Sequence, residues 1–468
     1  MKAFTKAVSI FSLFRQAIRG SEQNFTEGSI NRAIFLLSVP MILEMAMESF
    51  LAVVDILFIS RLHDNDAVTA VGLTESILAI VYSMAMGLGM AATAMVARRV
   101  GEKDGNGAAL AAVNALYIGF VISVSLSITG LLFYRDVLRI MGASPNTITV
   151  GSGYMRWMLG GNFSIVALFL VNAIFRGAGN AAIAMQSLWL ANIVNMLLDP
   201  ILIFGWGPFP AHGVEGAAIA TNIGRMVGVL YQIYYLYGEK GIIKIHKENL
   251  KADWTIIVRL LRVFVGNVLQ FLISSASWIF LARIMVNFGN AAFAGYQFAI
   301  RIIIFTILPS WGMANAAATL VGQNLGANQP DRAEKSVWKA GFFNMIFLGF
   351  MSIAFYFVSE PIMRFFSVDP EVVHYGTQCL RIVAFGYIFF GYGMVIIQSF
   401  NGAGDTRTPT IINLFGFWFF QIPLAYLLAV QLRFGPTGAF TAIAIAESLM
   451  AVVGILIFRR GKWKTVKI

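Results

Sequence analysis

Long uninterrupted runs of apolar residues recur along the chain, separated by short stretches that carry most of the charge. A helix needs about 20 apolar residues to cross the hydrocarbon core of a bilayer, and these runs reach that length. They are continuous rather than alternating, which favours helices over the strands of a barrel. The pattern predicts twelve membrane-spanning helices, at residues 34–60, 67–97, 108–133, 154–175, 182–206, 213–237, 255–287, 290–321, 336–357, 376–400, 408–430 and 437–458.

The two halves of the chain resemble each other in sequence, with matching segments in the same order and at a nearly constant offset. GLGMAATAMVARRVG (87–101) aligns with GMANAAATLVGQNLG (312–326), and RGAGN (176–180) aligns with NGAGD (401–405). Each half holds six predicted spans, so both halves enter the membrane from the same side. The sequence therefore predicts an all-α integral membrane protein of two pseudo-symmetric six-helix lobes, a transporter plan in which substrate binds between the repeats.

Charge adds an orientation to this plan. Hydrophobic residues make up 58% of the chain and charged residues 12%, and most Lys and Arg fall in segments on one side of the membrane. The positive-inside rule places that side in the cytoplasm together with both termini. The asymmetry explains the net charge of +11 without a nucleic-acid partner. We expect a cytoplasmic amphipathic segment, an N-lobe, a cytoplasmic linker, a C-lobe and a basic tail, at 1–33, 34–237, 238–254, 255–458 and 459–468.

The first 20 residues allow two readings. A basic start followed by a short apolar run is typical of a signal peptide, but Arg15 and Arg19 interrupt the run and no A-x-A site follows. An amphipathic helix on the inner leaflet is the favoured interpretation.

Several classes of chemistry find no support in the sequence. The single cysteine, Cys379, excludes an internal disulfide or a thiolate metal cluster. The chain contains no GxxxxGK[ST] motif or DDxxD-type metal cluster, and its four histidines fall at span ends or in loops. The GxGxxA matches at 87–92 and 177–182 follow no predicted strand. We therefore expect no enzyme activity and no cofactor.

The fifth span carries a carboxylate where apolar residues are expected. A charged Asp at a helix centre costs about 2.5–3.5 kcal/mol on insertion scales, so such a group normally faces a cavity, pairs or binds a proton. Asn192, Asn195 and Asp199 share one face of the span. Pro200 cannot donate to the carbonyl of Met196, which leaves an oxygen free beside the carboxylate. This combination suits a proton or a small hard cation.

The first span supplies possible partners. Glu44, Glu48 and Asp55 are spaced so that all three lie on one side of a helix. Depths in the two spans predict that Asp55 and Asp199 meet, although a permanently protonated structural network is the alternative. The second half lacks the pair: Pro423 is taken as the counterpart of Pro200, which places Ile422 where the first half has Asp199. Ion coupling is thus predicted in the first lobe.

These features together resemble the MATE (multidrug and toxic compound extrusion) family, within its DinF-like prokaryotic branch. The resemblance rests on twelve spans in two bundles, on Pro40 and Asp55 in the first span, on NxxxDP (195–200) in the fifth, and on RGAG (176–179) before it. It implies a first-lobe cation site of Asp55, Asn195 and Asp199, the metal ligands if Na⁺ is the coupling ion, with Thr221 as a fourth member.

The same resemblance implies a substrate cavity beside that site. Tyr154, Asn172 and Arg176 match positions that line or brace it, and Glu48 stands where a glutamine is common, so the site carries an extra acid. Glu44 and Met86 are further candidates for the cavity wall, although methionines at helical spacing often only pack. Arg301 and Glu447 are interpreted as a gate or a buried pair in the second lobe.

The predicted function is export of organic, often cationic or amphipathic compounds in exchange for H⁺ or Na⁺, by alternating access. Its partners are small-molecule substrates and the lipid bilayer. We expect a monomer in the bacterial inner membrane. The alternative is a lipid-linked oligosaccharide flippase of the same superfamily. A flippase calls for a strongly cationic cavity, whereas Arg225 and Arg301 are the cations identified within spans. An ion channel fits the duplicated two-lobe plan less well.

Overall fold

The structure of the protein, a computed structural model, describes residues 2–20, 25–62, 64–238, 243–466 and 468. The described residues are almost entirely helical and contain no strand, and each predicted span is mostly helical. Eight helices are long and apolar enough to cross a membrane by themselves, and two bent pairs raise the number to ten. The 31-residue α2 and the 23-residue α8 complete the twelve predicted spans.

The chain divides into two compact units. Unit 1 comprises Met1–Asn24 and Leu43–Phe264, and unit 2 comprises Phe25–Ile42 and Val265–Ile468. The boundary thus falls inside α2, two residues after Pro40.

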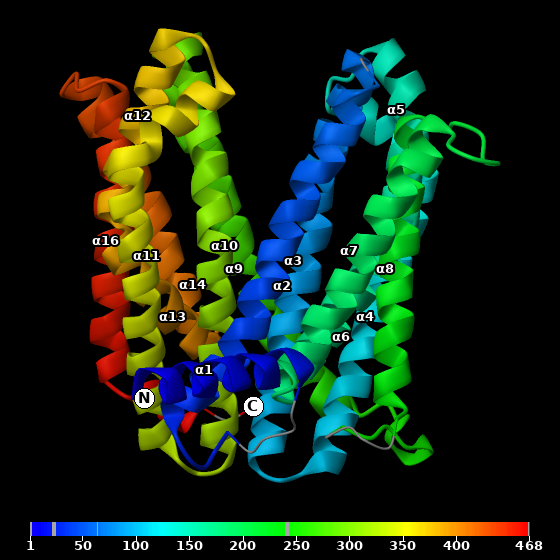
Figure 1. The fold of residues 1–468 in the computed structure, drawn as a ribbon, viewed down its shortest axis with the longest axis vertical. Coiled ribbons are helices and arrows are strands. Elements are labelled where there is room, and N and C mark those ends of the chain that lie inside the picture. The colour runs from blue at the N-terminus through cyan, green and yellow to red at the C-terminus, as the bar shows by residue number, and fades with distance from the viewer. Residues whose placement is uncertain (1, 21–24, 63, 239–242, 467) are drawn as a thin grey trace. The chain divides into compact units, whose positions relative to one another are not determined.

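Unit 1 contains an N-terminal helix and the helices of the first repeat, coloured blue to green in Figure 1. They are α1 (Lys2–Arg19), the larger part of α2 (Ile30–Ser60), α3 (Asn65–Gly101), α4 (Gly105–Ile140), α5 (Pro145–Gly160), α6 (Asn162–Gly177), α7 (Ala181–Phe204), α8 (Val214–Leu236), the 3-10 turn η1 (Lys247–Asn249) and the start of α9 (Trp254–Val286), up to Phe264. α1 is joined to α7 by a hydrogen bond of 2.8 Å from the Gln186 amide to the Ile18 carbonyl.

Local sequence explains where several of these helices begin and bend. The Asp64 carboxylate accepts from the backbone N–H groups of Asp66 and Ala67 and so caps α3. The predicted span at 154–175 is two helices, α5 and α6, which meet at Gly161 with a bend of 40°. At this break the Asn162 amide donates to the Leu159 carbonyl at 2.6 Å, satisfying one of the carbonyls that a helix end leaves free.

Glycines bring α7 and α8 close together in unit 1. A Cβ on Gly224 would lie 2.5 Å from the Ala191 carbonyl oxygen, and Gly216 and Gly228 are similarly tight against α7. Small residues let membrane helices approach closely enough for dense packing. This packing fixes the face that α7 presents to α8.

Unit 2 contains the end of the second repeat's first helix and the helices that follow it, green to red in Figure 1. They are α9 (Trp254–Val286), α10 (Asn290–Gly326), α11 (Pro330–Phe366), α12 (Pro370–Phe385), α13 (Tyr387–Ala403), α14 (Arg407–Asn413), η2 (Leu414–Gln421), α15 (Ile422–Tyr426), η3 (Leu427–Gln431), α16 (Pro436–Arg459) and η4 (Lys462–Thr465). α12 and α13 form a second bent span, at 59°. The helical span at 407–431 differs from α7 because η2 and η3 are π-helical.

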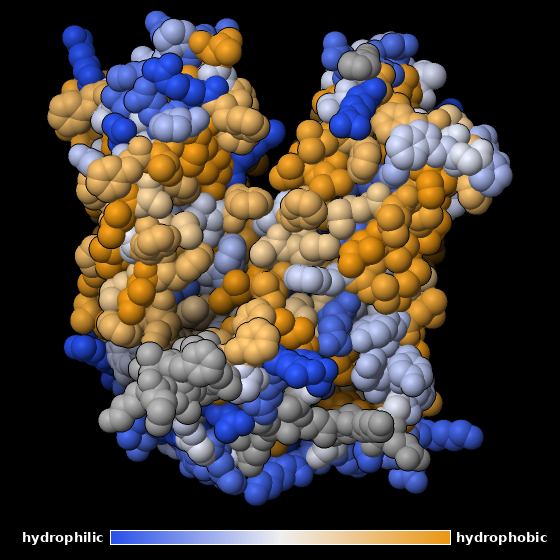
Figure 2. Space-filling model, in the orientation of Figure 1, coloured by the Kyte–Doolittle hydropathy of each residue, from blue (hydrophilic) through white to orange (hydrophobic). Residues whose placement is uncertain are grey.

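The surface of each unit matches a membrane protein. Figure 2 shows apolar side chains over the middle of each unit and polar side chains towards its ends. Many of these exposed residues are large, including Phe120, Leu132, Phe350 and Phe357, each more than half exposed. Such surface is stable only in contact with lipid.

Candidate functional site

Asp55 on α2 and Asp199 on α7 lie side by side within unit 1, close enough for their carboxyl groups to share a hydrogen bond. Asp199 is 1% exposed. Neither of its carboxyl oxygens receives a hydrogen bond from a described residue, and the same holds for the buried Oδ1 of Asp55. Two carboxyl groups can hydrogen-bond to each other only when one of them carries a proton, and two ionised carboxylates at this separation repel each other.

Asn195 and Thr221 adjoin this pair. The Asn195 amide donates to the Thr221 hydroxyl at 2.8 Å, and that hydroxyl donates to the Ala217 carbonyl at 2.9 Å. The Asn195 Oδ1 is buried and receives no donor among the described residues. Asn195 lies one helical turn before Asp199, so the amide and carboxyl oxygens point to the same side of α7.

The oxygens gathered here are ligands of the kind that hard cations prefer. No cluster of three or more His, Cys, Asp or Glu in the described part of the chain is arranged to hold a metal ion. A Na⁺ ion would therefore be coordinated by Asp55 and Asp199 together with the neutral oxygen of Asn195. A proton needs only the two carboxyl groups.

A second set of polar groups lies near Asp55. The Arg225 side chain on α8 is 8% exposed and donates from Nη2 to the Tyr82 hydroxyl at 2.6 Å, with its guanidinium over the Tyr82 ring. Arg225 acts electrostatically on Asp55, Glu48 and Glu75, and the Tyr154 hydroxyl is within hydrogen-bonding reach of Glu75. A single buried guanidinium thus faces several carboxyl groups.

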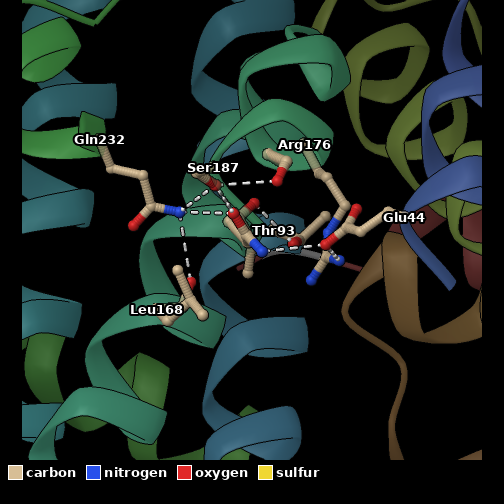
Figure 3. Close-up of polar contacts among 9 residues, drawn as sticks. Glu44, Thr93, Leu168, Arg176, Ser187 and Gln232 are labelled. Atoms are coloured by element: carbon tan, nitrogen blue, oxygen red, sulfur yellow. Dashed lines mark hydrogen bonds and ion pairs between the residues drawn. The ribbon is translucent and has the colours of Figure 1, made fainter. Parts of the chain in front are cut away.

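Glu44, Asn172 and Arg176 belong to a different network, shown in Figure 3. The Glu44 side chain is 1% exposed and pairs with Arg176 at 2.9 Å, while the Asn172 amide donates to the same carboxylate oxygen at 3.0 Å. The Ser187 hydroxyl and the Gln232 amide both donate to the side-chain oxygen of Asn172, Oδ1. The network therefore links α2, α6, α7 and α8.

The predicted residues consequently fall into separate groups. Glu44 lies eleven residues before Asp55 on α2, a rise of about 16 Å, so the Glu44 network is distant from the aspartate pair along the helix. Tyr154 and Met86 pack with an apolar cluster of unit 1. The roles of all these residues in ion coupling or substrate binding stay predictions.

Sequence reasoning missed Glu75 and Tyr82, which lie on α3 among apolar residues. Their spacing of seven places them on one helical face, and this periodicity was the signal that could have identified them. Arg225 was recognised as intramembrane but was not assigned to the site. Its partner Tyr82 is identified only by the fold.

Of the two interpretations of Arg301 and Glu447 in unit 2, the buried pair is wrong and the gate stays a prediction. Arg301 is exposed, and the described residues include no ion pair between the two side chains. The alignment that matches Gly87 with Gly312 places Arg301 opposite Ser76, so the first repeat has no cation at this position.

Comparison with known proteins places this arrangement in a family. The MatE family model matches residues 40–201 and 263–427, one stretch in each repeat. The chain is 26% identical to "Probable multidrug resistance protein YoeA" of Bacillus subtilis (strain 168), over 95% of the chain and 97% of that protein. It is 24% identical to "Multidrug export protein MepA" of Staphylococcus aureus (strain N315), over 92% of the chain and 94% of that protein.

Solved structures agree. A structure described as "Outward-facing conformation of a multidrug resistance MATE family transporter of the MOP superfamily" matches with a TM-score of 0.88 and 26% identity, covering 94% of this chain and 97% of the other. The family match spans both repeats and the helices that hold Asp55 and Asp199. The chain therefore belongs to the MatE family of membrane transporters.

Proposed function

We propose that the protein is a cation-coupled antiporter that exports organic compounds, with its ion site at Asp55 and Asp199 in unit 1. The observation that carries the proposal is the contact of two carboxyl groups, from α2 and α7, whose buried oxygens receive no donor from the described chain. Relatives named for multidrug resistance and export support the choice of organic substrates.

The chemistry follows from the charge on the pair. Two ionised carboxylates in contact repel strongly where water is scarce, so binding of H⁺ or Na⁺ brings α2 and α7 together and loss of the ion separates them. Pro40 leaves the carbonyl of Leu36 without its helical donor, which makes α2 easier to bend at this point. Ion binding on the outside thereby changes the shape of the lobe, and substrate is released.

Coupling requires that the ion bind the two states of the transporter differently. Each tenfold difference in affinity supplies about 1.4 kcal/mol of bias between the states. The emptied transporter then returns, loses the ion to the cytoplasm and binds new substrate. Asn195 and Thr221 orient the pair by fixing the neighbouring turn of α7 against α8.

The test is efflux of a fluorescent organic cation from proteoliposomes, driven in separate experiments by a pH gradient and by a Na⁺ gradient. We expect one gradient to drive efflux in the native protein and neither to do so in Asp55→Asn or Asp199→Asn. Asp136→Asn is the matched control, because Asp136 is an exposed carboxylate at the end of α4 that pairs with Arg139. Gradient-driven efflux of normal rate in both site variants refutes the proposal.

A further inference from the structure

The backbone hydrogen bonds allow the two repeats to be aligned residue by residue. Near the start of α7 the Asn180 N–H donates to the Phe175 carbonyl, and in unit 2 Asp405 donates to Phe400 in the same way. Near the end of α7 the His212 N–H donates to Leu202, and Phe434 donates to Leu428. The stretch from Asp405 to Leu428 is one residue longer than the stretch from Asn180 to Leu202. The second repeat therefore holds one extra residue in this helix.

The π-helical segments η2 and η3 accommodate that residue, because a π-turn contains more residues than an α-turn. The sequence register that paired Pro200 with Pro423 is therefore wrong by three positions at this end of the helix. Ala425, rather than Ile422, is the counterpart of Asp199. Gln421 is the counterpart of Asn195.

The last helix of each repeat can be aligned in the same way. Gly213 and Gly435 each accept a hydrogen bond from the glycine three residues later, and those second glycines pack against Leu202 and Leu428 respectively. Gly213 therefore matches Gly435, and both helices continue without interruption. Arg225 and Glu447 each lie twelve residues after the matched glycine. Glu447 is therefore the counterpart of Arg225, and unit 2 has an acid where unit 1 has its buried cation.

Glu447 points into unit 2. Its helix α16 has an exposed apolar face formed by Ile445, Leu449, Val452, Val453 and Leu456. At about 100° per residue, Glu447 lies on the opposite side of the helix from the centre of that face. The side chain is partly buried and lies on the same face as the buried residues Ile443, Met450 and Gly454.

Gln421 points inward as well. It belongs to a stripe of buried residues four apart, with Phe417, Ala425 and Ala429, on the segment that packs against α16. Gln421 is 0% exposed, and both atoms of its amide lack a hydrogen-bond partner in the described structure. In unit 1 the matching Asn195 donates to Thr221, but Ile443 stands at the Thr221 position and offers no such partner.

Glu447 lies on the same face of α16 as Ile443, one turn beyond it, or about 6 Å along the helix. Thr441 is closer to Ile443 in sequence, but it lies on another side of the helix and its hydroxyl donates to the Thr437 carbonyl. Glu447 has no hydrogen bond or ion pair with any described residue. A buried amide without partners and an intramembrane acid without partners are each unusual, and an acid within a span marks a functional site by default.

Elements packed against α16 bring no charge to this place. Their titratable residues form no bond with Glu447 in the described structure; these residues are Glu371, His374, Tyr375, Cys379 and Arg381 on α12, Tyr387 and Tyr392 on α13, Arg407 on α14 and Tyr426 on α15. Arg381 carries a positive charge that could pair with an acid, but its Nε donates to the Tyr356 carbonyl and to the Ser359 hydroxyl instead.

We propose that Glu447 and Gln421 form a proton-binding site inside unit 2. Rotation of the Glu447 side chain brings its carboxyl group into hydrogen-bonding contact with the Gln421 amide. The protonated carboxyl donates its O–H to the Gln421 Oε1, and the ionised carboxylate accepts from the Gln421 Nε2, so the amide serves both states. Together the two side chains offer three oxygens, fewer than the six or so that hard metal ions take. This site does not depend on the proposed role of Asp55 and Asp199.

The test uses dicyclohexylcarbodiimide, an apolar reagent that adds to protonated carboxyl groups within membranes. The full chain in proteoliposomes is treated at a series of pH values, and modification of the peptide containing Glu447 is measured by mass spectrometry. We expect modification at acidic pH that falls as pH rises. Gln421→Leu should move the pH of half-modification upward, because the amide's hydrogen bond to the ionised carboxylate is stronger than its bond to the neutral acid. Glu447→Gln removes the modified site and identifies the signal.

Two results overturn the proposal: no modification of Glu447 at any pH, or a pH profile that Gln421→Leu leaves unchanged. Unaltered thermal stability of Gln421→Leu excludes misfolding as the cause of a shift. The same profile is expected in an Asp55→Asn, Asp199→Asn double variant. A failure of ion coupling at the aspartates is therefore distinguishable from a failure at Glu447.

Discussion

The Glu44–Arg176 pair offers a quantitative prediction, because unit 2 contains a neutral version of it. Asn401, which takes the place of Arg176 in the second repeat, exchanges hydrogen bonds of 3.1 and 3.2 Å with Gln270 on α9. In both units the contact joins the first helix of a repeat to the end of its fourth span. Replacing Glu44 and Arg176 by Gln and Asn therefore copies an arrangement that the protein already uses.

Removing only one partner should be costly. Arg176→Asn leaves the Glu44 carboxylate buried with the Asn172 amide as its remaining donor, and an unpaired buried charge costs about 3–5 kcal/mol. Glu44→Gln should cost less, about 1–3 kcal/mol, because an amide remains where the carboxylate was. The double variant restores a neutral pair, so we expect a loss of about 1 kcal/mol. The two single losses together exceed it by about 3–7 kcal/mol, which is the expected coupling energy.

The assay is the free energy of unfolding in mixed detergent micelles, followed by tryptophan fluorescence as the fraction of denaturing detergent rises. Measuring the native protein, both single variants and the double variant closes a thermodynamic cycle. If the two single losses simply add in the double variant, the ion pair is not stabilising and the argument from burial is wrong.

Two further predictions concern packing and the Arg225 environment. Gly224→Leu should lower the free energy of unfolding by about 1–3 kcal/mol, because even a Cβ at this position meets the Ala191 carbonyl oxygen. Gly72→Ala, where a Cβ has open space, should raise the free energy of unfolding by about 0.5–1 kcal/mol. Thermal unfolding compares the two variants. Tyr82→Phe removes the acceptor of a buried guanidinium and should cost about 1–3 kcal/mol, measured in the same way; a neutral result there means that Arg225 finds another acceptor.

Much of the fold follows from the sequence because a bilayer imposes a simple rule on spans. Length and continuous apolarity located all twelve, and the repeat was visible in RGAGN and NGAGD. The bends were not predictable, because α5 and α6 are as apolar together as one span. The break at Gly161 depends on tertiary contacts, with the Asn222 side chain packed against the glycine.

The candidate site was predictable where acids interrupt apolar runs. Asp55 and Asp199 stand out for this reason, and depth in the membrane was enough to predict that they meet. The pairing of Glu44 with Arg176 was not predicted, since one-dimensional spacing on α2 does not reveal which helix lies opposite. The counterpart of Asp199 was misplaced because π-helical turns hold an extra residue, and nothing in the uninterrupted apolar sequence shows where it is.

The central claim is that Asp55 and Asp199 couple an ion gradient to transport rather than merely bind substrate. The most direct measurement compares two fluxes in the same proteoliposomes: movement of substrate down its own gradient, and accumulation of substrate against it under an imposed ion gradient. Asp55→Asn and Asp199→Asn should retain the first flux and lose the second. Accumulation by either variant to the native level contradicts the account.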